Sequence, residues 1–160
     1  MSKLQYQNKL TKQKVSIIIK WYRVYHKLWN MKLYTLSKII YHLSRLLFNC
    51  VIPPTVELGE NVNCGHAMGI IIHQNCKIGK NTLIYQNVTI GRRGDNVEES
   101  PIIGENCIIG AGACILGKII IGNNVKIGAN VVVIDDIPSN TTVVCHKPRI
   151  IKKRGDSDSE

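Results

Sequence analysis

A six-residue repeat constrains the fold of this 160-residue chain more than any other feature of its sequence. An aliphatic or small apolar residue recurs at six-residue steps over most of the chain, with interruptions at two places. The repeated positions are Ile52, Leu58, Cys64, Ile72, Ile78, Ile84, Ile90, Ile103, Ile109, Ile115, Ile121, Ile127 and Val133. Regular internal repeats are typical of solenoids, in which each repeat buries its apolar face against the next one. We therefore predict a stacked repeat architecture over residues 52–146.

The composition of each repeat predicts the shape of the coil. A block of six residues makes one short strand and a turn, so three blocks close a triangular coil of about 18 residues. Stacked coils then pair their backbones at roughly 4.8 Å, as neighbouring strands do. Glycine often follows the aliphatic residue, as at Gly59, Gly79 and Gly104. We expect this glycine column to form the tight corners, because glycine adopts backbone conformations that other residues avoid. The fold class is therefore mainly β, a parallel β-helix.

Two segments interrupt the repeat. The first is "NCGHAMG" (63–69), which surrounds His66, and the second is "GRRGDNVEESP" (91–101), which places polar residues where two blocks should be. A polar segment that leaves a regular solenoid must loop outward, and functional residues concentrate on such loops. Both breaks are therefore candidates for one and the same site.

The N-terminal third lacks the repeat and has apolar residues at mixed three- and four-residue steps. That pattern predicts two helices with a bend near residues 30–32. Pro53 and Pro54 mark the boundary before the coils. We expect a basic α-helical region over residues 1–50, the β-helix over residues 51–153 and a disordered acidic tail over residues 154–160.

The net charge of +10 is concentrated in the N-terminal third, where residues 1–50 hold ten Lys and Arg and no Asp or Glu. Such asymmetry favours an anionic surface as a partner, and a solvated helical face is the alternative. The sequence contains no run of about 18 consecutive apolar residues, so we expect no membrane-spanning helix. The six cysteines form no CxxC pair and follow no secretory signal, so we expect free thiols in a reducing cytoplasm and no metal site. No motif for reading nucleic acid is present.

Three segments, "GHAMGIII", "YQNVTIG" and "IGAGACILGKIIIGNNVKIGANVVV", resemble the serine acetyltransferase family of hexapeptide-repeat acyltransferases. The loop "TIGRRGDN…PIIG" and the end "VVCHKPRIIK" resemble more closely the colanic-acid-type polysaccharide acetyltransferase branch. The resemblance implies a left-handed β-helix, a homotrimer and acetyl transfer from acetyl-CoA to a hydroxyl. It implies acetyl-CoA as a co-substrate, with no metal and no permanently bound cofactor.

The resemblance also implies the catalytic residues. His66 matches the family's catalytic histidine, and an imidazole with a pKa near ~6.5 is suited to remove a hydroxyl proton at neutral pH. Its small neighbours Gly65, Ala67 and Gly69 leave room for two substrates. The matching donor for the developing oxyanion is a backbone N–H at Gly91 or Arg92.

The matching acetyl-CoA positions lie along the coils, in a groove between two β-helices. Gly91, Ala111 and Ala129 are small enough for the pantetheine arm to lie against the backbone. Lys147 and Arg149 are expected to meet the phosphates of CoA, with solvated surface charges as the alternative.

Two departures from the family concern the acceptor. Gly65 replaces an Asp that precedes the catalytic histidine, and Ser100 replaces a second histidine before the Pro that closes the loop. In the family both residues help to seat serine. Asp95 and Ser100 are the candidate acceptor-binding residues, and Asp95, in the loop, is a candidate to replace the missing carboxylate. We read His73 and His146 as structural residues.

These departures lead us to expect a sugar hydroxyl of a surface-polysaccharide precursor as the acceptor. The alternatives are L-serine, as in cysteine biosynthesis, and a noncatalytic β-helix scaffold. Two roles for residues 12–48 stay open: they hold the enzyme at the inner face of an anionic membrane, or they cap the open end of the β-helix.

Overall fold

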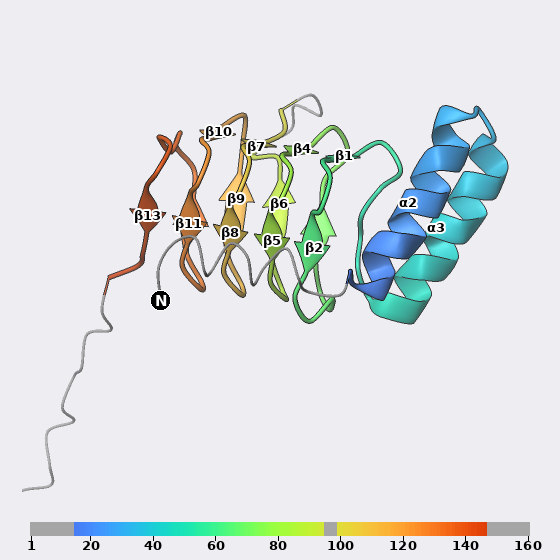
Figure 1. The fold of residues 1–160 in the computed structure, drawn as a ribbon, viewed down its shortest axis with the longest axis horizontal. Coiled ribbons are helices and arrows are strands. Elements are labelled where there is room, and N and C mark those ends of the chain that lie inside the picture. The colour runs from blue at the N-terminus through green and yellow to red at the C-terminus, as the bar shows by residue number, and fades with distance from the viewer. Residues whose placement is uncertain (1–14, 95–98, 147–160) are drawn as a thin grey trace, which may run out of the picture.

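The computed structural model describes residues 15–94 and 99–146, and these form a β-helix with two helices at its N-terminal end (Figure 1). The first face of the β-helix contains β1 (Glu57–Leu58), β4 (Lys77–Ile78), β7 (Ile102–Ile103) and β10 (Ile120–Ile121). The second face contains β2 (Asn63–Cys64), β5 (Leu83–Ile84), β8 (Ile108–Ile109), β11 (Lys126–Ile127) and β13 (Thr142–Val143). The third face contains β3 (Ile71–Ile72), β6 (Thr89–Gly91), β9 (Cys114–Leu116) and β12 (Val132–Val133).

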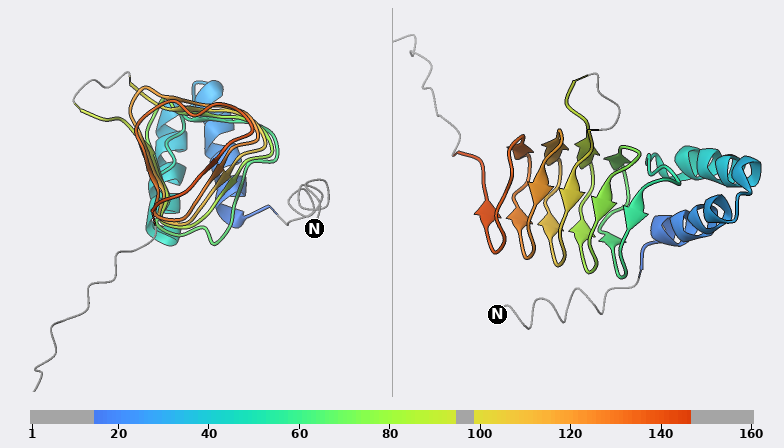
Figure 2. Two further views of the ribbon diagram at one scale, coloured as in Figure 1. Left: turned by 90° about the vertical axis from the view of Figure 1, so that its left-hand side faces the viewer. Right: turned by 90° about the horizontal axis from the view of Figure 1, so that it is seen from above.

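All of these neighbouring strands pair in parallel, and their register follows the six-residue repeat. The paired columns are Leu58–Ile78–Ile103–Ile121, Cys64–Ile84–Ile109–Ile127–Val143 and Ile72–Ile90–Ile115–Val133. Seen along its axis, the stack of coils is a triangle from which one loop projects (Figure 2). The prediction of a left-handed parallel β-helix is confirmed.

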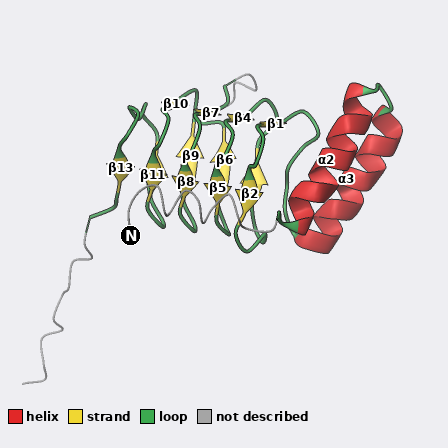
Figure 3. Ribbon diagram, in the orientation of Figure 1, coloured by secondary structure: helices red, strands yellow, loops and turns green. Residues whose placement is uncertain are grey.

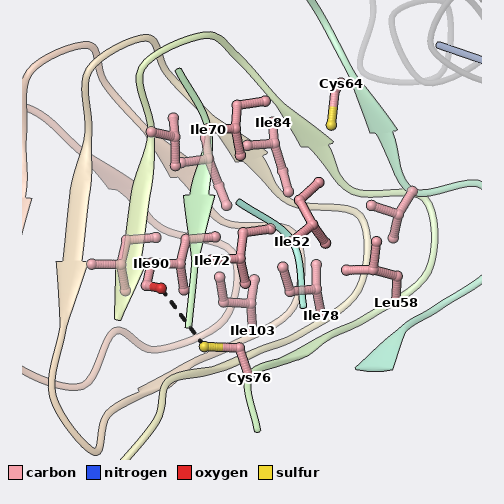
Figure 4. Packing of buried hydrophobic residues seen from close by; sticks show 14 of the residues in the cluster. Ile52, Leu58, Cys64, Ile70, Ile72, Cys76, Ile78, Ile84, Ile90 and Ile103 are labelled. Atoms are coloured by element: carbon pink, nitrogen blue, oxygen red, sulfur yellow. Dashed lines mark hydrogen bonds between the residues drawn. The ribbon is translucent and has the colours of Figure 1, made fainter. Parts of the chain in front are cut away.

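The interior of the triangle is filled by these aliphatic columns (Figure 4). Ile84, Ile90, Ile109 and Ile115 have no exposed surface, and most of the other repeated positions are nearly as buried. Full burial of one such side chain contributes about 1.5–3 kcal/mol relative to an exposed one. Cys76 belongs to the same core, with its Sγ directed at the Ile90 carbonyl oxygen.

The glycine column has a different role from the one we predicted. None of the glycines that follow the repeated aliphatic residue has a positive φ. A Cβ added at Gly79 would lie 2.6 Å from the carbonyl carbon and oxygen of Gly104, and one at Gly104 would lie 2.7 Å from those atoms of Gly122. Glycine is therefore required because successive coils touch at these positions, so that no side chain fits between them.

Asparagine takes the left-handed corner conformation instead. Asn61, Asn81, Asn106, Asn124 and Asn140 all have φ between 55° and 63° and occupy one corner of the triangle in successive coils. Asparagine is among the few residues that adopt this conformation readily. The side chains also bond to one another along the stack, with Asn61 Nδ2 donating to Asn81 Oδ1 at 3.1 Å and Asn81 Nδ2 donating to Asn106 Oδ1 at 3.2 Å.

Helix α2 (Ile17–Asn30) covers the open end of the first coil. Its buried residues are Ile18, Ile19, Tyr22 and Tyr25. Tyr22 and Tyr25 donate their hydroxyl hydrogens to the carbonyl oxygens of Val56 (2.5 Å) and Ile52 (2.7 Å). Arg23 donates to the carbonyl oxygens of Leu58 and Gly59, and His26 bonds to that of Pro54. Of the two roles left open for residues 12–48, these contacts of α2 correspond to the cap on the β-helix.

Helix α3 (Tyr34–Phe48) packs alongside α2 at the same end of the β-helix (Figure 3). Ser37 and Ser44 are buried against α2, and Ser37 Oγ donates to the Tyr25 carbonyl oxygen at 2.7 Å. The opposite side of α3 is exposed and apolar; we call it the α3 outer face, and it consists of Leu36, Ile39, Leu43, Leu46 and Leu47. Neither described helix has the length and apolar character needed to cross a membrane.

Candidate active site

The predicted site residues fall on two of the three edges at which the faces of the β-helix meet. The alanine edge joins the second and third faces and consists of residues 65–70, 85–88, 110–113 and 128–131. The loop edge joins the third and first faces and consists of residues 73–76, 91–94, 99–101 and 117–119. The remaining edge is the asparagine corner described above.

The alanine edge is built by backbone hydrogen bonds between successive coils. Asn87 N donates to Met68 O at 2.9 Å, Gly112 N donates to Gln86 O at 3.0 Å, and Asn130 N donates to Ala111 O at 2.8 Å. His66, Ala111 and Ala129 therefore lie along one edge, in its first, third and fourth turns. Gln86 belongs to the same edge, and its buried Oε1 has no hydrogen-bond partner within the described residues.

His66 lies in an insertion on this edge. Eight positions separate Cys64 from Ile72, whereas six separate the equivalent Ile84 and Ile90, so the corner that holds His66 has two additional residues. His66 adopts φ of 50°, and its side chain is exposed. In the described part of the chain, no hydrogen bond orients its ring. The insertion thus presents an accessible imidazole.

Tyr85 explains why glycine precedes this histidine. A Cβ added at Gly65 would lie 3.2 Å from Cε1 and 3.3 Å from Cδ1 of Tyr85, which is closer than an ordinary contact. The aromatic ring therefore occupies the space into which a longer side chain at position 65 would extend. This packing accounts for Gly65 where the resemblance leads us to expect Asp.

The loop edge holds Gly91, Arg92 and Ser100. Gly91 ends β6 and is buried, Arg92 is exposed, and the Gly91 carbonyl oxygen accepts a hydrogen bond from Gly117 N at 2.9 Å. A Cβ added at Gly91 would lie 3.8 Å from the Cβ of His73, which is the equivalent residue one coil earlier.

Ser100 and His73 come together on this edge. His73 Nδ1 lies 3.1 Å from Ser100 Oγ, and Ser100 Oγ lies 3.0 Å from the Gln74 carbonyl oxygen. The structure therefore brings an imidazole to the position where Ser100 replaces a histidine. Sequence reasoning assigned His73 only a structural role, although its distance of 18 positions from Gly91, one full coil, was available as a signal.

A single chain does not bring His66 and Gly91 together, because they lie at opposite ends of the third face. Along one coil, the extended segment from Gly69 to His73 alone spans on the order of 13 Å. The expectation that both breaks of the repeat form one site is therefore not met within one chain. Asp95, Lys147 and Arg149 lie outside the described residues, as does the tail over residues 154–160.

The buried cysteines contribute little reactivity to either edge. Burial raises the pKa of Cys64 to about 12 and the pKa of Cys76 to about 11. Both remain protonated near neutral pH, whereas the thiolate is the nucleophilic form. Over residues 15–94 and 99–146, no group of three potential metal ligands gathers at one place.

Comparison with known proteins identifies the repeats. The family model "Bacterial transferase hexapeptide (six repeats)" matches residues 100–135, and "Hexapeptide repeat of succinyl-transferase" matches residues 58–86. The serine acetyltransferase of Staphylococcus aureus strain Mu50 is 42% identical over 131 residues, which are 81% of this chain and 62% of the relative. That of Synechococcus elongatus is 41% identical over 135 residues, which are 84% of this chain and 55% of the relative.

Solved structures give the same result. Soybean serine acetyltransferase complexed with serine superposes with a TM-score of 0.77 at 34% identity, covering 84% of this chain and 56% of that one. Isoform 3 of the Entamoeba histolytica enzyme, in complex with cysteine, gives 0.78 at 32% identity and covers 85% and 49%. The chain thus spans less than two thirds of the length of each of these relatives.

These relatives contradict our expectation of a polysaccharide sugar as the acceptor, and they do not support the colanic-acid-type branch. That expectation rested on two residues missing from the linear sequence, Gly65 and Ser100. The structure gives a physical reason for the error: Tyr85 fills the space beside Gly65, and His73 reaches Ser100 from another coil. The absence of a residue type at one position is therefore weak evidence about the chemistry of the folded site.

Proposed function

We propose, since this chain belongs to the hexapeptide-repeat acetyltransferase family, that it transfers the acetyl group of acetyl-CoA to the hydroxyl of L-serine. The observation that carries this proposal is the exposed imidazole of His66, held in an insertion on the edge that also bears Ala111 and Ala129. The serine acetyltransferases that match 81–84% of this chain support serine as the acceptor.

In this reaction His66 acts as the general base. It removes the proton of the serine hydroxyl as the oxygen attacks the thioester carbonyl carbon, and the carbonyl oxygen becomes negatively charged. A backbone N–H at Gly91 or Arg92 donates a hydrogen bond to that oxyanion. Collapse of the tetrahedral intermediate breaks the carbon–sulfur bond, and the CoA thiolate takes the proton from the His66 imidazolium. The products are O-acetyl-L-serine and CoA, and no permanently bound cofactor takes part.

This chemistry requires two copies of the chain. His66 and the oxyanion donor lie on different edges, separated within one chain by the third face. We infer a homotrimer in which the alanine edge of one subunit faces the loop edge of its neighbour, because a cyclic head-to-tail arrangement repeats the same contact around a closed ring. Each trimer then holds three equivalent sites.

Acetyl-CoA is proposed to lie along the alanine edge, between neighbouring subunits. Ala111 is partly exposed and Ala129 is exposed, so the pantetheine arm can approach the backbone there. Lys147 and Arg149 remain the residues proposed to meet the CoA phosphates.

The experiment that tests this function follows the release of the CoA thiol from acetyl-CoA. Wild-type protein should release CoA with L-serine at millimolar concentration, and O-acetylserine should appear in equal amount by mass spectrometry. Glycine and L-alanine, which lack the hydroxyl, serve as control substrates. Thiol release that does not depend on the acceptor, or no release with L-serine, would reject the proposal.

We propose a cytoplasmic protein whose α3 outer face associates with the inner face of the membrane. This face is apolar, and residues 15–50 contain six basic and no acidic residues, so an anionic leaflet complements their charge. Amphipathic helices bind such surfaces by burying the apolar face. Binding to anionic vesicles should weaken with added salt and be lost in the double variant Ile39→Ser/Leu46→Ser. If the intact trimer does not bind at low salt, this association is wrong.

A further inference from the structure

The cluster of His73, Ser100 and Gln74 on the loop edge is a polar feature that the proposed reaction has not used. Ser100 is 8% exposed, and its hydroxyl lies 3.0 Å from the Gln74 carbonyl oxygen and 3.1 Å from His73 Nδ1. The Cys76 thiol also interacts with the Ser100 side chain. A buried network of this kind orients its members when every polar atom is satisfied.

The chemistry of the partners assigns the hydrogens. A carbonyl oxygen only accepts hydrogen bonds, so the single hydroxyl hydrogen of Ser100 goes to Gln74 O. Ser100 Oγ then accepts from His73, which means that His73 Nδ1 carries a hydrogen. In a neutral imidazole with Nδ1 protonated, Nε2 has a lone pair and acts as an acceptor. The cluster therefore selects the tautomer in which His73 offers Nε2 as an acceptor.

The location of the His73 ring places its Nε2 atom near the proposed reaction. His73 lies one coil before Gly91, and the two residues are close enough for an added Cβ at Gly91 to contact His73 Cβ at 3.8 Å. Ser100 lies at the other end of the loop that begins after Gly91. In the proposed reaction, the oxyanion of the tetrahedral intermediate is bound by the backbone N–H of Gly91 or Arg92. The substrate that receives the acetyl group would therefore lie beside the His73 imidazole.

We propose that His73 is an acceptor-binding residue whose Nε2 receives a hydrogen bond from the ammonium group of the amino-acid acceptor, and that Ser100 is its positioning residue. This proposal deepens the proposed function and rests on it. It also accounts for Gly65 in place of a carboxylate, because the ammonium group donates its hydrogen bond to His73 Nε2 on the loop edge of the neighbouring subunit instead.

The test compares L-serine with 3-hydroxypropanoate, which has the hydroxyl and the carboxylate but no ammonium group. A hydrogen bond to a charged group contributes enough for His73→Ala to lower kcat/KM for L-serine by about 10- to 100-fold, mainly through KM. The same variant should leave kcat/KM for 3-hydroxypropanoate and KM for acetyl-CoA within about twofold of wild type. The second substrate also reports whether the variant is correctly folded.

Two further variants separate positioning from packing. Ser100→Ala should raise KM for L-serine. Ser100→Thr keeps the hydroxyl, so its KM for L-serine should be close to that of wild type. Gln74→Ala is the matched control, because Gln74 contributes only its backbone carbonyl and the variant retains it.

The outcomes distinguish this inference from the proposed function. If wild-type protein does not acetylate L-serine, the proposed function is wrong and the inference fails with it. If wild-type protein acetylates L-serine and His73→Ala has an unchanged KM, or loses both substrates equally, only the role of His73 is wrong.

Discussion

Mixing two impaired variants tests whether the active site is shared between subunits. His66→Asn removes the base from the alanine edge and should lower kcat by roughly 10²–10⁴-fold. His73→Ala impairs the loop edge and should retain about 1–10% of wild-type kcat/KM for L-serine. If the proposed trimer is assembled from equal amounts of both variants, each site should combine the alanine edge of one subunit with the loop edge of its neighbour. Half of the alanine edges and half of the loop edges are intact, so about a quarter of the sites are wild type.

The measurement is the rate of CoA release at subsaturating L-serine after co-refolding, with native mass spectrometry to confirm mixed trimers. We expect about 25% of wild-type activity, against no more than about 5% for the average of the two parents. If both edges acted within one subunit, mixed trimers would contain no intact site and would stay at the parental average. Confirmed mixed trimers at that level would refute the shared site and the reasoning from the separation across the third face.

Three further predictions concern single residues. His66→Asn should unfold at a temperature at least equal to that of wild type in a thermal scan, because asparagine tolerates a φ of 50° well; a marked loss would mean that the imidazole supports the fold. Gly79→Ala should destabilise by about 1–3 kcal/mol and lower the midpoint by about 2–12 °C, whereas Gly91→Ala, with its nearest contact at 3.8 Å, should stay within about 1 °C. Burial raises the pKa of Tyr22 to about 12 from 10.0, so the stability contributed by its protonated form should be lost as pH rises from about 10 to 12. Tyr22→Phe should show a smaller loss in urea titrations over that range, and an equal loss would exclude this residue as the cause.

The β-helix was predictable from sequence because its stability depends on a strict period. The position that Ile90 occupies points inward in every coil, so each coil needs an apolar residue there. The apolar residues therefore recur in the sequence with the period of the coil. The corners were less predictable, because glycine and asparagine both adopt the left-handed conformation readily. Only the structure shows that the asparagines adopt it, whereas Gly79 is required because the backbone of Gly104 in the next coil leaves no room for a side chain.

The residues of the candidate site were predictable from the sequence, but their placement relative to one another was not. His66 stood out because it interrupts the period, but no local pattern shows that Gly91 lies on a different edge. That separation depends on which face each strand joins, and therefore on the length of every preceding turn. The pairing of His73 with Ser100 likewise depends on residues 99–101 lying on the same edge of the β-helix as residues 91–94.

The hydrogen bonds from α2 to the first coil determine how these molecules can meet end to end. A bare β-helix exposes a row of unpaired backbone groups at each end, and such edges invite another chain to add strands. Here the carbonyl oxygens of Ile52, Val56 and Leu58 are already occupied by Tyr25, Tyr22 and Arg23. Head-to-tail growth into a filament needs two complementary ends, so blocking one of them is sufficient to stop it. The N-terminal helix thereby limits a fold built from stackable repeats to a finite particle.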